Sequence, residues 1–61
     1  MMTMREARQR CNLVNARIMR TGADFEVTLN EWSRQERIKS AYFTDDLEDA
    51  VLTAQAMRRR A

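Results

Sequence analysis

The sequence predicts a small α+β domain of order α-β-β-α, an antiparallel hairpin flanked by two helices, over residues 1–61. Apolar residues recur at helical spacing near both ends of the chain. A stretch that follows the single glycine, Gly22, alternates apolar and polar residues, as in a strand with one buried face. No proline, repeat or linker divides the chain, so we expect one domain.

The first helix is expected between Thr3 and Gly22. Thr3 and Glu6 have the spacing of a capping box, which satisfies free N–H groups at a helix start. Gly22 suits the left-handed position that ends many helices. The apolar stripe of this helix recurs every three or four residues and comprises Met4, Ala7, Cys11, Val14 and Ile18.

Two strands are expected next. The first contains Phe25, Val27 and Leu29 on one face. Polar residues 33–36 predict a loop longer than a tight two-residue turn. The second strand is expected over about residues 38–44.

The pairing of these strands decides which side chains share a face. An antiparallel register would place Ala41 and Phe43 beside the apolar face of the first strand. Trp32, Ile38 and Tyr42 would then emerge together on the reverse side.

The last helix has the strongest start signal. Thr44 or Asp45 is expected as the N-cap, and Asp45 with Glu48 has capping-box spacing. Acidic residues crowd its first turn and three arginines end it, which is the polarity that the helix dipole favours. Its apolar stripe comprises Leu47, Ala50, Val51, Ala54 and Met57.

A two-stranded hairpin is marginal in water, and both of its edges would be open. We therefore predict a twofold dimer that completes the sheet, either by edge-to-edge pairing or by stacking through the Trp32 face. The alternative is a closed monomer in which the first helix covers Trp32. The predicted dimer or protein interface comprises Trp32, Ile38, Tyr42, Leu13 and Leu52.

The composition argues against an enzyme. There is no histidine to act as a general base, and neither a nucleophile–base pair nor a phosphate-binding glycine loop can be assembled. The lone Cys11 lies on the apolar stripe and is expected in the core. The acids of residues 45–49 lack the ligand spacing of a calcium loop, so we interpret them as helix-capping residues. No metal or cofactor is expected.

Charge is unevenly distributed along the chain. Residues 1–22 carry five arginines and one glutamate, whereas residues 23–57 carry eight acids and three basic residues. The helix dipole explains the acids of residues 45–49 and the basic tail, but not the arginines of the first helix. Candidate contacts to a protein or nucleic acid are Arg5, Arg8, Arg17, Arg20, Arg58, Arg59 and Arg60.

Three interpretations of these arginines remain open. They could pair with acids elsewhere in the dimer, contact phosphates, or bind an acidic protein. A double-stranded-RNA-binding domain has a helix, three strands and a helix, with basic residues opening the last helix. The expected order is one strand short and its last helix opens with acids, so no resemblance is drawn.

No apolar run approaches the roughly 20 residues that span a bilayer, and no secretory signal is evident. The arginine-rich beginning superficially suits a transit peptide, but its removal would leave about 39 residues, too few to fold unaided. We therefore predict a cytoplasmic protein of a size that suits bacterial or phage small proteins. The predicted function is a non-enzymatic interaction module, a homodimer that binds a protein partner. The alternative is a nucleic-acid-binding accessory or regulatory protein that uses the first-helix arginines.

Overall fold

The computed structural model describes residues 1–60 and confirms a small α+β domain, with three helices and a three-stranded antiparallel sheet. The elements are α1 (Met4–Leu13), β1 (Ala16–Thr21), β2 (Asp24–Leu29), α2 (Arg34–Ser40), β3 (Tyr42–Thr44) and α3 (Leu47–Arg60). The expected α-β-β-α order is therefore wrong. A strand takes the second half of the expected first helix, and a short helix takes the start of the expected second strand.

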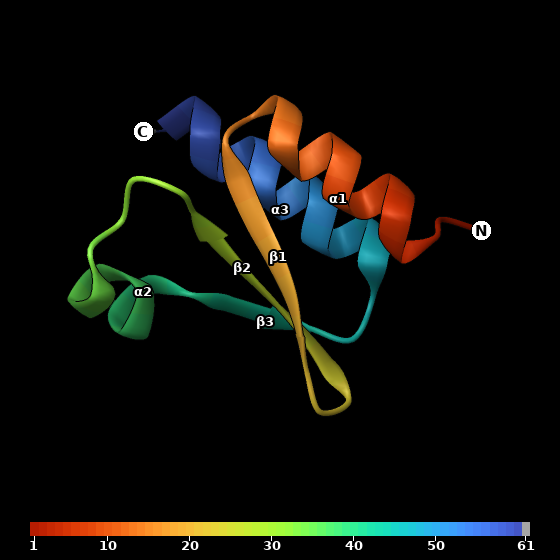
Figure 1. Ribbon diagram of the computed structural model, residues 1–61, viewed down its shortest axis with the longest axis horizontal. Coiled ribbons are helices and arrows are strands. Elements are labelled where there is room, and N and C mark those ends of the chain that lie inside the picture. The colour runs from red at the N-terminus through yellow and green to blue at the C-terminus, as the bar shows by residue number, and fades with distance from the viewer. Residues whose placement is uncertain (61) are drawn as a thin grey trace.

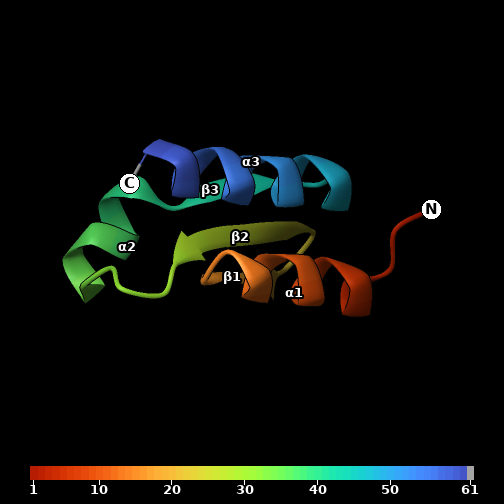
Figure 2. The same ribbon diagram turned by 90° about the horizontal axis from the view of Figure 1, so that it is seen from above.

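The sheet and two of the helices form two layers. The strand order is β1-β2-β3, and α1 and α3 lie side by side over one face of the sheet (Figures 1 and 2). The short α2 lies away from this helix pair, near the end of β2 (Figure 1). The core between the layers comprises Ala7, Cys11, Ala16, Ile18, Val27, Leu29, Ala50, Val51 and Ala54. Cys11 is buried there, as predicted.

The helix α1 begins as predicted and ends early. The hydroxyl of Thr3 accepts the N–H of Glu6 at 3.2 Å. The helix stops at Leu13, and Asn15 adopts a left-handed φ of 53°, a conformation that asparagine tolerates better than most residues. From Ala16 the chain alternates between buried and exposed residues, which is the pattern of a strand.

The glycine has the predicted left-handed conformation but a different role. Gly22, with φ of 63°, and Ala23 form the two-residue loop between the paired residues Thr21 and Asp24. A positive φ at the first loop position alone is typical of a type II′ hairpin turn. Gly22 therefore joins β1 to β2 rather than ending a helix.

A capping box lies where a loop was expected. The Ser33 hydroxyl accepts the N–H of Glu36 at 3.2 Å, and the Glu36 carboxylate accepts the N–H of Ser33 at 3.1 Å. These two bonds satisfy donors at the start of α2. Ile38 consequently lies on a helix.

The pairing of β3 differs from the expected register by one residue. Val27 pairs with Tyr42, Glu26 with Phe43, and Phe25 with Thr44. Because a slip of one residue exchanges the two faces of a strand, Tyr42 faces the helices and Phe43 faces the open side. The predicted placement of Phe43 in the core, and of Tyr42 on the reverse side, is wrong.

The last helix begins with acids, as predicted, although the cap is Asp46. Its carboxylate accepts the N–H of Glu48 at 3.0 Å, and the Thr44 hydroxyl accepts the N–H of Asp46 at 3.3 Å. Glu48 and Asp49 lie in the first turn, and Arg58–Arg60 in the last. None of the helices in residues 1–60 is both long and apolar enough to cross a membrane.

The sheet has a third strand, and its two edges are β1 and β3. β3 contains three residues and completes a three-stranded sheet. The Asn30 N–H donates to the Asn15 carbonyl at 3.0 Å, which fixes the hydrogen-bonding pattern of the strand pair. The backbone N–H and C=O groups of the odd-numbered residues of β1 therefore bond to β2, and those of the even-numbered residues point away from β2. Ala16 and Ile18 are only 1% and 5% exposed. β3 remains an edge strand with Phe43 exposed, so edge-to-edge pairing of two copies stays a prediction.

Candidate interaction surface

The three aromatic and apolar residues predicted to form one patch lie in three different places. Trp32 is half-buried against the core and lines a hollow with Leu29 and Met57. The Tyr42 hydroxyl donates to the Asp49 carboxylate at 2.6 Å, beside α3. Ile38 projects from α2 and is 75% exposed. The predicted Trp32–Ile38–Tyr42 patch is therefore wrong.

Two other predicted interface residues are exposed without forming a patch. Leu13 ends α1, and Leu52 lies in the middle of α3 on the side away from the sheet core. Single exposed apolar residues are normal on protein surfaces. They serve below as control positions.

The outward face of the sheet carries no helix layer, and α2 flanks it beside β2. A hollow of about 280 Å³ lies there, which we term the α2 hollow; it is lined by Arg17, Met19, Thr28, Arg34, Arg37 and Ile38, together with Glu26. Phe43 is exposed on the same face because it pairs with Glu26. The α2 hollow therefore combines apolar side chains with three arginines and one glutamate.

A second hollow, of about 300 Å³, lies between α1 and the edge of the sheet. We term it the α1 hollow; it is lined by Arg8 and Asn12 of α1, by Ala16, Arg17 and Ile18 of β1, and by Asn30, which follows β2. Arg17 lines both hollows. The two hollows are thus joined at Arg17, an arrangement that sequence analysis missed because it requires α2 and the strand β1.

The arginines of this surface form no ion pair within the part of the chain that the structure describes. Among residues 1–60, the one ion pair within 4.0 Å joins Arg58 to Glu31. Arg8, Arg17, Arg34 and Arg37, which we term the basic band, therefore have no carboxylate at that distance. The interpretation that the arginines of the expected first helix pair with acids elsewhere in a dimer stays a prediction. Arg5 and Arg20 are also exposed, outside both hollows.

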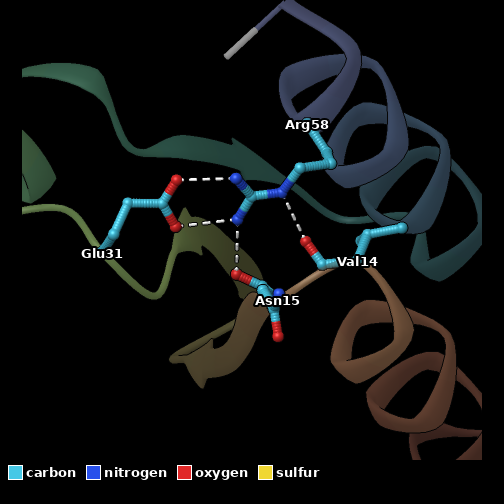
Figure 3. A network of polar contacts seen from close by, with 4 residues as sticks. All are labelled: Val14, Asn15, Glu31 and Arg58. Atoms are coloured by element: carbon cyan, nitrogen blue, oxygen red, sulfur yellow. Dashed lines mark hydrogen bonds and ion pairs between the residues drawn. The ribbon is translucent and has the colours of Figure 1, made fainter.

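Arg58 is engaged in the structure of the domain itself (Figure 3). Its Nε–H donates to the Val14 carbonyl at 2.7 Å, and Nη2 donates to the Asn15 carbonyl at 3.0 Å. The same guanidinium donates to both carboxylate oxygens of Glu31, at 2.6 and 2.7 Å. These hydrogen bonds lower the pKa of Glu31 from its ordinary 4.5 to about 2 and raise that of Arg58. Of the predicted basic tail, Arg59 and Arg60 remain exposed.

The remaining chemical candidates have structural roles. Burial raises the pKa of the Cys11 thiol, which disfavours the nucleophilic thiolate. Asp46 caps α3, and the hydrogen bond from Tyr42 lowers the pKa of Asp49. In residues 1–60, no three His, Cys, Asp or Glu side chains form a group that could hold a metal ion.

No protein-family model, curated protein or solved structure matches the chain. Function is therefore argued from the residues of the two hollows.

Proposed function

We propose that this chain is a non-enzymatic binding module whose partner is an acidic protein that docks on the α2 hollow. The supporting observation is the composition of that face. Met19, Ile38 and Phe43 are exposed on this face, and three arginines line its hollow. Protein interfaces are enriched in methionine, aromatic residues and arginine.

The chemistry of the face favours a partner that is both apolar and acidic. Covering Ile38 would contribute about 1.5–3 kcal/mol, the usual value for burying such a side chain. Arg34 and Arg37 lie beside it, and their planar guanidinium groups suit paired hydrogen bonds to carboxylates. Apolar contact would provide affinity, and the charges would set orientation and association rate.

The same charges argue for a different protein rather than a second copy. Stacking two copies through the α2 hollow would bring three arginines and one glutamate from each copy together. Like charges facing each other across an interface are unfavourable. The homodimer predicted from the sequence is thus replaced here by a partner of opposite charge.

Site-specific photo-crosslinking tests this proposal. A photoreactive residue at Ile38 is expected to capture an acidic protein in cells, whereas the same residue at Leu52, which is also exposed, is not. The purified partner should then bind the unmodified chain and lose about tenfold or more in affinity with Ile38→Ser, and more with Arg37→Glu. Capture of only a second copy, or equal capture from both positions, would contradict the proposal.

A nucleic acid is the second candidate, because the basic band has no acidic partners within the described chain. The strand β3 supplies the third strand of a double-stranded-RNA-binding arrangement, although α2 separates it from β2 in the chain. One objection remains, because α3 begins with acids. Apolar residues and Glu26 also interrupt the band.

An electrophoretic shift assay with duplex and single strands distinguishes these two candidates. At about 100 mM salt and tens of micromolar protein, a non-specific nucleic-acid binder shifts its target, and its affinity falls steeply as salt rises. We expect no shift. A salt-dependent shift that Arg17→Gln weakens would favour the nucleic-acid function instead.

A further inference from the structure

The α1 hollow contains four polar side chains that have no partner within the described chain. Arg8 and Asn12 come from α1, Arg17 from β1, and Asn30 from the segment after β2. Among residues 1–60, the side-chain hydrogen bonds involve other residues. Two guanidinium groups and two carboxamides thus surround one hollow with their donors free.

We infer that the α1 hollow binds an oxyanion of the phosphate type. Each guanidinium carries five N–H donors and each carboxamide two, so donors predominate strongly over acceptors. No carboxylate lines this hollow, whereas Glu26 lines the α2 hollow. Ala16 and Ile18 also line this hollow, and neither has a charged side chain.

The arrangement suits a tetrahedral anion better than a carboxylate. The four polar side chains come from a helix, a strand and a loop, and all four residues are exposed where they line the hollow. A phosphate group presents oxygens in several directions and can accept from all of these side chains. A carboxylate presents two oxygens in one plane, which a single guanidinium can satisfy.

The ligand is a phosphate monoester rather than a nucleic-acid backbone. Binding a nucleic-acid backbone requires contacts to several consecutive phosphates. Beyond Arg17, however, the band is interrupted by Met19, Ile38 and Glu26. One phosphate site at the end of an apolar and basic face fits a single phosphorylated group. This site needs no protein partner, so it goes beyond the proposed function, although Arg17 connects the two surfaces.

Titration with inorganic phosphate, followed by nuclear magnetic resonance, tests the site directly. At about pH 7 inorganic phosphate is a mixture of the monoanion and the dianion, and ionic strength is held constant with chloride. The side-chain N–H signals of Arg8, Asn12, Arg17 and Asn30 are expected to shift together and to saturate. Arg8→Gln and Arg17→Gln should each weaken binding about tenfold, because each removes hydrogen bonds from a charged donor.

Two matched variants separate a pocket from general attraction to positive charge. Arg5→Gln changes the same helix outside the hollow, and Arg34→Gln changes the α2 hollow alone. Both should bind phosphate as the unmodified chain does, and circular dichroism should show unchanged melting for all four variants. A shift that does not saturate, or an equal loss in Arg5→Gln, would overturn the inference.

Two further ligands identify the source of the phosphate. Phosphoserine is expected to shift the same four signals, and serine is not. With a short single-stranded oligonucleotide at the same concentration of phosphate groups, the shifts of these signals should not reach saturation. Tight oligonucleotide binding that depends on Arg5 and Arg20 as much as on Arg8 and Arg17 would overturn the monoester assignment in favour of a nucleic acid. Failure of phosphate binding would leave the crosslinking result at Ile38 unaffected, so the two proposals are tested separately.

Discussion

Arg58 and Glu31 are joined by two parallel hydrogen bonds, 2.6 Å from Nη1 to Oε2 and 2.7 Å from Nη2 to Oε1 (Figure 3). The same guanidinium binds the carbonyls of Val14 and Asn15, where the chain passes from α1 to β1. One side chain of α3 thereby holds the two segments that lead into the α1 hollow, because Ala16 follows Asn15 and Asn30 precedes Glu31.

This pair predicts a pH dependence of stability. The pKa of Glu31 is lowered from 4.5 to about 2 in the folded chain, so its contribution is present above the unfolded value and is lost as pH falls through the folded value. Glu31→Gln should therefore lower the melting temperature at neutral pH. The difference between the two chains should narrow as the pH falls from about 4.5 towards 2.

Thermal melting at a series of pH values measures this effect. Arg59→Gln is the matched control, because Arg59 is exposed and adjacent to Arg58. Its melting temperature should follow that of the unmodified chain throughout. A difference between Glu31→Gln and the unmodified chain that stays constant down to about pH 2 would contradict the role of the pair.

The pairing of Tyr42 with Asp49 predicts a second titration. The hydrogen bond to the Asp49 carboxylate raises the pKa of Tyr42 above its ordinary 10.0. Asp49→Asn should bring that pKa back towards 10.0, because the charged acceptor is removed. Tyr42 is the only tyrosine, so the ultraviolet absorbance of the phenolate reports this group alone. An unchanged titration would show that Tyr42 does not face α3, and would restore the register expected from the sequence.

The parts of the fold that could be predicted are those whose sequence signal is local and fits only one type of secondary structure. The alternation of Phe25, Val27 and Leu29 has no helical counterpart, and β2 forms there. The acids before α3 and the arginines at its end suit one orientation of the helix dipole.

The missed elements had ambiguous or weak signals. Val14 and Ile18 are four residues apart, which fits a helical stripe, whereas Ala16 and Ile18 are two apart, which fits a strand. The capping box of Ser33 and Glu36 was visible in the sequence, but α2 has only seven residues and no apolar stripe. Short helices of this kind depend on their caps.

The candidate site was only partly accessible to prediction for a different reason. Arg8 and Arg17 were identified because of the charge excess near the start of the chain. Asn12 lies on α1, one turn after Arg8, whereas Arg34, Arg37 and Asn30 join them only through the sheet and α2. The pair of Arg58 and Glu31 joins residues 27 positions apart, and no local pattern marks such a contact.

The hairpin loop predicts a backbone effect at Gly22. Its φ of 63° is a conformation that residues with a Cβ rarely adopt, although no atom within 4 Å would clash with an added Cβ. Gly22→Ala should therefore destabilise the domain by about 1 kcal/mol through backbone strain alone. Gly22→Asn should cost less, because asparagine tolerates this conformation. Urea unfolding measures both variants, and equal stability of Gly22→Ala and the unmodified chain would contradict the loop assignment.

The charges of the open sheet face predict the oligomeric state. That face carries more arginines than acids, so it does not suit stacking of identical copies. Gel filtration at micromolar concentration should give one elution volume corresponding to about 7.2 kDa. A higher apparent mass that Ile38→Ser reduces, while Leu13→Ser does not, would show that two copies associate through the α2 hollow. That result would reinstate the homodimer and remove the acidic partner from the same surface.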